Sequence, residues 1–472
     1  MSEPTIANLE ARLAAIDARL TARATEGGAR DEQAERALQR ERLDAALSLA
    51  WELGMSDPAR CRALSLAAQS RAEALGYDRG RALAGRNLGY LNLFGDGLEQ
   101  AFQDVLAARD MLAALEDPRG VADCEDVLAN IFLRLDALDR ALEHSARCLE
   151  LNERLGNQRG VGWAHHNLGL VHQRMGDGAA AEQEYKQAAA CFQAIGHDHG
   201  LARIEGLLAH TLVERGELAA AAQAHARAIR LWGDNRLAGY SHISAARLHL
   251  DHGHGELTTA REHIARAREI GEGLDVPDMH AAIELLHARA LLREGPEAQA
   301  EAERVLVALL ENEAYQTVFA RGGVFTTERE ALELLAERCE RRGEFERALR
   351  FLRRRVERER ATVDADSRAR ARNMQISMGV AAAEREAQVV ERLLLNTLPR
   401  PIVRELRLRG RVAPVHHAHA TVLFTDFVGF TRIAAALEPA ALVDELDRLF
   451  TDFDAIAQRR GLEKLKTIGD AY

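Results

Sequence analysis

Residues 165–177, HHNLGLVHQRMGD, set the pattern from which the fold of most of the chain can be worked out. Apolar residues recur there at helical spacing, a Gly-Asp pair ends the run, and a small residue, Ala181, follows shortly after. Residues 87–96, NLGYLNLFGD, repeat this arrangement with Ala101 in the corresponding place. Helical periodicity interrupted by a glycine-containing turn is typical of two helices that fold back on each other. Each stretch therefore predicts an antiparallel helix pair.

The same markers return about every forty residues from residue 40 to residue 320. The glycine, leucine and alanine series are Gly80, Gly120, Gly160, Gly200 and Gly239; Leu88, Leu128, Leu168, Leu208 and Leu248; and Ala101, Ala141, Ala181, Ala221, Ala260 and Ala300. One divergent pair, Ala331 to Arg355 with a turn at Gly343-Glu344, extends the series. Each pair is expected to have a tight turn inside it, with a loop that carries the glycine of the series between one pair and the next. A single helix pair cannot cover its own apolar face, so neighbouring pairs must stack into a solenoid. We expect a mainly α fold, with the solenoid over residues 39–355.

The motifs N-L-G and G-D followed by the small residue resemble tetratricopeptide (TPR) repeats. The usual TPR period is shorter than forty residues, so we interpret these as a variety with longer loops. HEAT-type repeats share the period but lack those signatures. The resemblance implies a concave face that binds an unidentified protein or peptide.

Two further helical segments flank the solenoid. Residues 1–38 carry an amphipathic stripe (Ile6, Leu9, Leu13, Ile16 and Leu20), which predicts a capping helix rather than a coiled coil. Residues 356–400 carry a heptad seam (Ile376, Val380, Ala383, Ala387, Val390 and Leu394) with charged residues beside it. This pattern favours a helix that pairs in parallel with a second copy over a buried core helix. Residues 401–419 are a basic linker, interpreted as a solvated helix end rather than a phosphate or lipid contact.

The last segment, 420–472, has a different pattern. Residues Ala420 to Phe424 predict a short strand that opens, after Asp426, into a loop containing Gly429. A helix is expected from Glu438-Pro439 to Gly461, then an extended run to Ile468 and a hairpin turn at Gly469-Asp470. If the two extended runs lie side by side, Asp426 and Asp470 face each other. Close carboxylates repel unless a cation lies between them, and oxygen ligands favour a hard ion such as Mg²⁺.

The motifs TVLFTDFVGFT and EKLKTIGDAY resemble the opening half of a class III nucleotidyl cyclase catalytic domain, whose fold is α+β and ferredoxin-like. The resemblance implies that Asp426, Asp470 and the backbone carbonyl of Phe427 bind two Mg²⁺ or Mn²⁺ ions. Phe427 departs from the aliphatic residues that are commoner at its position. The resemblance also implies that the backbone of Val428, Gly429, Phe430 and Thr431 holds the nucleotide phosphates.

The resemblance further implies a reaction and a mode of control. The family's ribose 3′-hydroxyl attacks the α-phosphorus and releases pyrophosphate. Lys466 stands where adenylate cyclases read adenine and guanylate cyclases usually have glutamate, which favours ATP over GTP. Residues 356–400 resemble the signalling helix that often precedes such domains, and a homodimer is expected because the family's active sites form between two protomers.

Tyr472 falls within the family motif, so we expect residues 420–472 to be an incomplete cyclase domain, from a truncated sequence or a broken gene, and inactive as a fragment. The second hypothesis is a TPR interaction scaffold with a non-catalytic cyclase remnant. The codons that follow Tyr472 separate the two: an open frame carrying an Asn and an Arg supports the enzyme, and a stop supports the remnant.

Composition narrows the class of protein. The formal net charge is −11, which argues against general nucleic-acid binding. The five scattered cysteines show no CxxC and are expected to be reduced core thiols. No apolar run reaches the length of a membrane span, and the N-terminus lacks a signal-peptide pattern. We therefore expect a cytoplasmic protein without a membrane partner. The histidines at 249, 252, 254, 416, 417 and 419 are interpreted as exposed loop residues rather than metal ligands.

Overall fold

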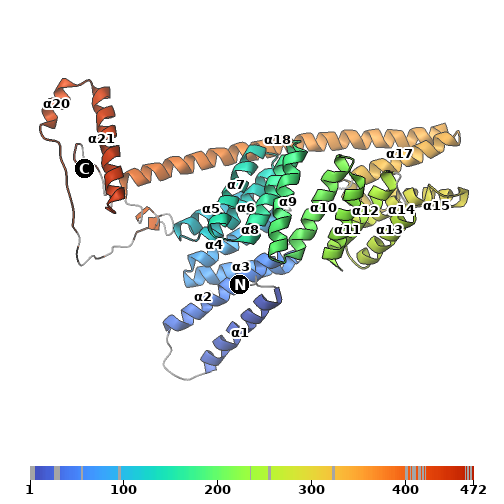
Figure 1. The fold of residues 1–472 in the computed structure, drawn as a ribbon, viewed down its shortest axis with the longest axis horizontal. Coiled ribbons are helices and arrows are strands. Elements are labelled where there is room, and N and C mark those ends of the chain that lie inside the picture. Colours follow the sequence, from blue (N-terminus) through green and yellow to red (C-terminus); the bar gives the residue numbers. More distant parts are fainter. Residues whose placement is uncertain are drawn as a thin grey trace. The chain divides into compact units, whose positions relative to one another are not determined.

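The computed structural model describes residues 6–25, 32–54, 57–93, 97–233, 235–252, 257–320, 325–398, 402–403, 405–406, 411–412, 416, 419, 421–462, 464, 467 and 470–472 (Figure 1). Its helices are α1 (Ile6–Thr25), α2 (Glu32–Leu53), α3 (Pro58–Leu75), α4 (Asp78–Asn92), α5 (Leu98–Ala114), α6 (Pro118–Arg134), α7 (Leu138–Arg154), α8 (Gln158–Arg174), α9 (Gly178–Ala194), α10 (Asp198–Glu214), α11 (Leu218–Trp232), α12 (Arg236–Asp251), α13 (Leu257–Gly271), α14 (Pro277–Leu291), α15 (Pro296–Glu311), α16 (Glu313–Ala320), α17 (Phe325–Arg341), α18 (Phe345–Thr397), α20 (Phe430–Ala436) and α21 (Pro439–Arg459). No strand is assigned in these residues, so the mainly α expectation is confirmed for them.

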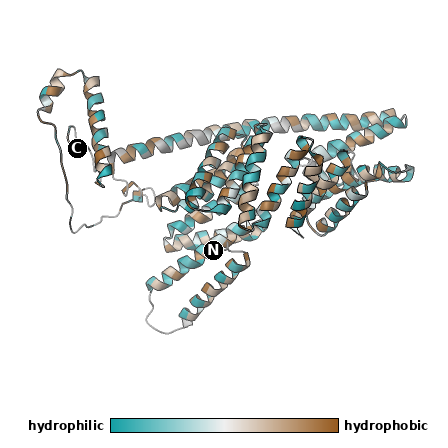
Figure 2. Ribbon diagram, viewed as in Figure 1, coloured by the Kyte–Doolittle hydropathy of each residue, from teal (hydrophilic) through white to brown (hydrophobic). Residues whose placement is uncertain are grey.

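Two compact units divide the chain, and each is described by itself. Residues 122–376 make one unit, and residues 4–121 together with 377–472 make the other. In the first unit, successive helices from α7 to α15 lie beside one another (Figure 1). Each of these helices carries both hydrophobic and hydrophilic residues along its length (Figure 2), as a helix that buries one face in a solenoid must.

The forty-residue period comes from long helices, which corrects the expectation of longer loops. Helices α8 and α9 have 17 residues each. The connections 175–177 and 195–197 have only three residues each. After α8 the chain reverses with Gly176 at a φ of +81°, and the Asp177 N–H donates to the His172 carbonyl at 2.9 Å. This is the hydrogen-bond pattern of a glycine-ended helix, and it needs few residues.

The glycine series also lies in helices rather than in loops. Gly160 is the third residue of α8, where an added Cβ would come 2.0 Å from Oδ1 of Asn152 on α7. Gly200 holds the same place in α10, and its Cβ would lie 2.6 Å from Nδ1 of His197. These glycines therefore allow each helix to start tightly against the end of the preceding one.

Stacking of neighbouring repeats is confirmed by hydrogen bonds that span about one period. Asn167 of the N-L-G motif donates to Asp126 Oδ1 at 2.8 Å, across a separation of 41 residues. In the other unit, Asn87 donates to the Leu47 carbonyl at 3.0 Å, across 40 residues. The alanine series is buried through Ala260, but Ala300 is exposed and Ala302 takes the buried position. The expected phase is thus wrong in the last repeat.

The N-terminal helix packs on the solenoid as a cap. Leu9 and Ile16 of α1 are buried against apolar residues that include Leu38 and Ala45 of α2. The cluster around Leu9 also includes Cys61 of α3 and Leu91 of α4. A seam buried against the first helices of a solenoid is the contact expected of a capping helix. The boundary expected after residue 38 lies inside α2, which continues to Leu53.

The last solenoid helix and the expected signalling helix are one element. Helix α18 has 53 residues and runs through the boundary expected at residue 355 without a break (Figure 1). At 1.5 Å per residue it is about 80 Å long. Of the expected heptad seam, Val390 is exposed and Ile376 and Leu394 are half-buried, while the side chains of Val380, Ala383 and Ala387 lie outside the described residues.

Candidate active site

The expected first strand is not formed in the described residues 421–424. Leu423 and Phe424 leave 72% and 71% of their surfaces exposed. A strand exists only where a neighbour completes its hydrogen bonds, and the described pairing in this segment is limited to Thr425. The α+β architecture therefore stays a prediction. The second expected strand, 462–468, has only residues 462, 464 and 467 described, and none of them is in a strand.

A single backbone pairing brings the two aspartate segments together. The Thr425 N–H donates to the Tyr472 carbonyl at 2.9 Å, and the Tyr472 N–H donates to the Thr425 carbonyl at 2.9 Å. Two residues that exchange both hydrogen bonds form an antiparallel pair with Cα atoms about 5.5 Å apart. Asp426 follows Thr425 directly, and Asp470 precedes Tyr472 by two residues. The backbone segments that carry Asp426 and Asp470 are thus joined, and the facing of the two carboxylates stays a prediction.

The expected loop after Asp426 contains Gly429 and is followed directly by a helix. Asp426 is exposed, and its Oδ1 accepts a hydrogen bond from the Phe427 N–H at 3.1 Å. Gly429 takes a φ of +76°, which glycine adopts without steric cost. Helix α20 then begins at Phe430, so Phe430 and Thr431 of the expected phosphate loop form its first turn. Val428 lies in the turn and is almost fully exposed.

The ring of Phe427 packs away from the loop into an aromatic cluster. Its centroid lies 6.4 Å from that of Phe430, and 6.2 Å from those of Phe450 and Phe453 on α21. Helix α21 ends where expected, with Gly461 at a φ of +66°. The cluster therefore ties the Asp426 turn to α21. An aromatic residue at 427 serves this packing, which is a physical reason for its departure from the aliphatic pattern.

The donor set of the site consists of oxygen atoms. It comprises the Asp426 and Asp470 carboxylates and the Phe427 carbonyl, which also accepts a long hydrogen bond from the Phe430 N–H at 3.4 Å. In the described part of the chain, no group of three or more His, Cys, Asp or Glu side chains could hold a metal ion. One or two carboxylates completed by substrate phosphates are the usual protein ligands of Mg²⁺, so these residues fit a divalent hard ion. Lys466, the expected base-reading residue, lies outside the described residues.

Family comparisons match both parts of the chain. The adenylate and guanylate cyclase catalytic domain matches residues 412–472. The tetratricopeptide repeat matches residues 121–194 and 160–233. The chain joins tetratricopeptide repeats to cyclase catalytic-domain sequence.

Relatives of the cyclase segment include enzymes named for either nucleotide. Retinal guanylyl cyclase 1 of Rattus norvegicus is 43% identical over 89 residues, which is 19% of this chain and 8% of that protein. An adenylate cyclase of Mycobacterium bovis is 43% identical over 93 residues, which is 20% of this chain and 21% of that protein. The chain thus spans a small part of each relative, and equal identity to both does not separate ATP from GTP.

The TPR region has a structural neighbour with the same kind of fold. The apo form of the quorum sensor NprR from B. thuringiensis superposes with a TM-score of 0.51 over 75% of this chain and 99% of that chain. The two are 14% identical, so the likeness shows the helical-repeat fold alone.

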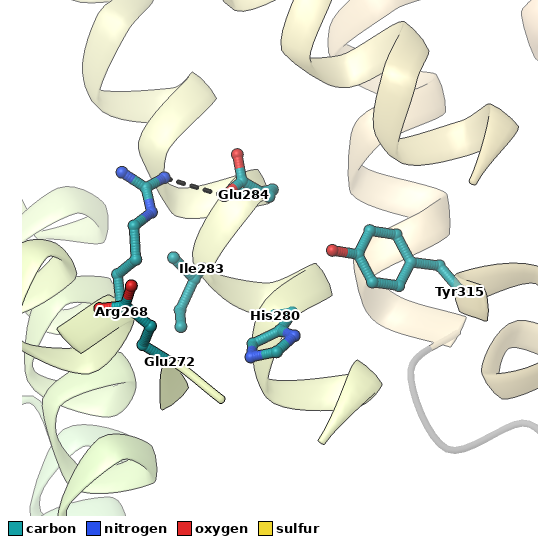
Figure 3. Close-up of a pocket in the computed structure, with 6 residues that line it drawn as sticks. All are labelled: Arg268, Glu272, His280, Ile283, Glu284 and Tyr315. Atoms are coloured by element: carbon teal, nitrogen blue, oxygen red, sulfur yellow. Dashed lines mark hydrogen bonds and ion pairs between the residues drawn. The ribbon is translucent and has the colours of Figure 1, made fainter. Parts of the chain in front are cut away.

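A pocket in the TPR region contains residues that the sequence pattern did not identify. It is a cavity of about 350 Å³ lined by Arg268, Glu272, His280, Ile283, Glu284 and Tyr315 (Figure 3). Arg268 on α13 donates to Glu284 Oε1 on α14 at 2.9 Å. Tyr315, from α16, faces this ion pair across the pocket (Figure 3). The lining residues come from α13 and the residue after it, from α14 and from α16, so spacing along the chain gave no signal for them.

The cysteines and histidines can also be compared with expectation. All five cysteines are free thiols, and four of them are buried. His249 differs from the expected loop position, because it lies on α12 with its ring stacked 5.8 Å from that of His263. Among the described residues, no helix is both long enough and apolar enough to cross a membrane.

Proposed function

We propose that this chain belongs to a cytoplasmic adenylate cyclase that makes cyclic AMP and pyrophosphate from ATP. The observation that carries the proposal is the Thr425–Tyr472 backbone pair, which joins the segments that carry Asp426 and Asp470 inside the region that matches the cyclase catalytic domain. A two-metal phosphoryl-transfer site needs carboxylates from two such neighbouring segments.

The proposed roles follow from the chemistry of each group. Asp426, Asp470 and the Phe427 carbonyl would hold two Mg²⁺ or Mn²⁺ ions, and the backbone of residues 428–431 would orient the nucleotide phosphates. Bound divalent ions of this kind lower the pKa of an attacking hydroxyl and stabilise the charge that develops on the phosphoryl oxygens. The chain's own contribution is to fix the carboxylates, which repel each other until cations neutralise them.

ATP is the proposed substrate because position 466 is lysine. Adenine presents a ring acceptor to a lysine ammonium group, whereas guanine presents donors that a glutamate would accept. The relatives named for each nucleotide are equally similar, so Lys466 alone supports this part of the proposal.

We further propose that the enzyme works as a homodimer paired through α18. In the expected seam of α18 (Ile376, Val380, Ala383, Ala387, Val390 and Leu394), Val390 is exposed. Apolar residues repeating at this heptad spacing on a long charged helix are typical of a parallel coiled coil. The guanylyl cyclase match covers 89 residues, which exceeds the 61 residues of the family match. Part of the similarity therefore lies upstream of Val412, toward α18.

The proposed regulator is a protein or peptide bound by the TPR region. The pocket around Arg268 offers an anion and a cation side by side, with a tyrosine hydroxyl opposite. A peptide carries the complementary groups in its ionised side chains and backbone. Binding there would alter the stacking of α13, α14 and α16, and so the support on which α18 begins.

The decisive experiment measures both Mn²⁺ binding and cyclic AMP formation in a purified protein that carries this chain with a complete cyclase domain. Asp426→Ala and Asp470→Ala should abolish both, since each removes one of the two carboxylates. Asp444→Ala, at an exposed carboxylate on α21, is the matched control and should retain both. Undiminished Mn²⁺ binding in Asp426→Ala would reject the metal assignment. A wild-type chain that binds neither Mn²⁺ nor ATP would favour the interaction scaffold with a cyclase remnant.

A further inference from the structure

We propose that Asp454, on α21, is a positioning residue that holds the two metal-binding aspartates in register through Tyr472. This inference rests on the proposed function and names a residue to which nothing above assigns a role. Asp454 is not proposed as a metal ligand; it acts on the chain segment that carries Asp470.

Both oxygens of the Asp454 carboxylate are engaged. Oδ1 accepts a hydrogen bond from the Tyr472 hydroxyl at 2.6 Å, and Oδ2 accepts one from Nζ of Lys464 at 2.8 Å. The Lys464 ammonium group also lies 5.3 Å from the centroid of the Tyr472 ring. The three side chains therefore form a closed network in which each one contacts the other two. Hydrogen bonds to an ionised acceptor are the strong ones in proteins.

Tyr472 is held at three points. Its hydroxyl binds Asp454, its ring packs 5.4 Å from Phe453 and 6.0 Å from Phe450, and its backbone pairs with Thr425. Because these contacts fix Tyr472, it can pair with only one residue of the Thr425 segment. A slip of one residue would move Asp470 by about 3.3 Å along the Thr425 segment, and so would change its distance from Asp426.

The aromatic cluster alone does not explain a carboxylate at 454. Phe427, Phe450 and Phe453 already join the Asp426 turn to α21 through ring contacts. Ring contacts are tolerant of small shifts, whereas the carboxylate fixes a phenol and an ammonium group at defined distances. Lys464 stands two residues before Lys466, and Tyr472 stands two residues after Asp470. The network therefore fixes one residue just before the proposed base-reading Lys466 and one residue just after the second proposed metal ligand, Asp470.

The test compares Asp454→Ala and Tyr472→Phe with Asp452→Asn, a control at an exposed carboxylate two residues away on the same helix. Mn²⁺ binding to the full chain is followed by the loss of the free-ion electron paramagnetic resonance signal. We expect both test variants to weaken Mn²⁺ binding roughly tenfold or more, the change that corresponds to losing a hydrogen bond to a charged group. Asp454→Asn, which keeps an acceptor for Tyr472 but loses the charge facing Lys464, should fall between them and the wild type.

Amide hydrogen exchange supplies a readout that needs no metal. In Asp454→Ala, exchange should accelerate at residues 424–427 and 470–472 together, while the solenoid helices stay unchanged. The proposal is overturned if Asp454→Ala binds Mn²⁺ as tightly as the wild type, or if the two segments keep wild-type exchange. Asp426→Ala separates the two levels of argument. If it abolishes Mn²⁺ binding and Asp454→Ala does not weaken it, only the positioning role fails; if neither affects binding, the proposed metal site fails.

Discussion

Replacing Gly169 by alanine is the sharpest test of how the repeats pack. Gly169 belongs to the N-L-G motif on α8, and a Cβ added there would lie 2.4 Å from Cε1 and 2.6 Å from Cδ1 of Tyr185 on α9. Carbon atoms in contact normally stay at least about 3.5 Å apart, so the ring must move by roughly 1 Å. Tyr185 is fully buried and its hydroxyl donates to Gln173 at 2.8 Å, which leaves it little room to move.

The expected change in the free energy of unfolding is the sum of two destabilising effects and one stabilising effect. Overpacking a close-packed core costs about 1–3 kcal/mol, and losing the Tyr185 hydrogen bond would add about 1 kcal/mol. Alanine returns up to about 1 kcal/mol because it is the better helix former. We therefore expect Gly169→Ala to destabilise the solenoid by about 1–3 kcal/mol.

Gly206 on α10 is the matched control, because a Cβ there would meet nothing within 4 Å. Gly206→Ala should raise stability by up to about 1 kcal/mol through helix propensity alone. Urea unfolding followed by far-ultraviolet circular dichroism compares the two variants with the wild type. If Gly169→Ala proves as stable as Gly206→Ala, the close approach of α8 to α9 is not as the structure has it, and the packing argument fails.

Three further predictions concern the substrate, the dimer and the solenoid. Lys466→Glu should weaken the preference for ATP, and an unchanged ratio of ATP to GTP turnover would show that this position does not read the base. Val390→Glu should shift the chain toward monomer in sedimentation equilibrium, whereas Arg392→Glu should not; equal dimer fractions would exclude pairing through this face of α18. Burial, and then repulsion from His263, lowers the pKa of His242 to about 4, from the ordinary 6.5. As the pH falls, His242 therefore binds a proton in the unfolded chain before it does so in the folded chain. The stability that the folded chain gains from neutral His242 is present above pH 6.5 and is lost toward pH 4. His242→Gln should reduce the fall in urea midpoint between pH 7 and pH 5, and an identical fall would contradict the assignment.

The repeats show what periodicity can and cannot predict. A forty-residue period locates each helix pair, because residues such as Leu168 and Leu208 must return to the same buried face. The period does not say whether the extra residues lengthen the helices or the loops, since both keep the markers in phase. Likewise, Gly160 suggested a loop because its close neighbour, Asn152, is supplied by the preceding helix. That contact depends on the crossing of two helices and has no local sequence signal.

In the cyclase segment too, the sequence predicted some of the site residues and gave no indication of others. The motifs identified Asp426 and Asp470 because each stands at a fixed place in a long family pattern. They did not identify Asp454, whose partners Lys464 and Tyr472 lie 10 and 18 residues away. Its one local signal is a carboxylate directly after Phe453, beside the apolar stripe of α21. The strand over 420–424 was wrong for the described residues because β-forming composition cannot supply the neighbouring strand that a sheet requires.

Helix α18 gives the proposed regulation a physical route, because its first turns are fixed to the last repeats and apolar side chains are exposed farther along it. Near its start, Phe351 packs against a core cluster that includes Leu335 of α17. Arg354 and Arg358 then both donate to Oε1 of Glu328, at 3.3 and 3.2 Å, and Glu328 is only 1% exposed. Separating the buried Glu328 carboxylate from these arginines would strongly destabilise the folded state. The start of α18 must therefore follow any displacement of α17. Farther along, Val363 and Met374 expose more than half of their surfaces. A ligand that shifts the last repeats would therefore reorient α18, and two paired copies would convert that reorientation into a change of pairing.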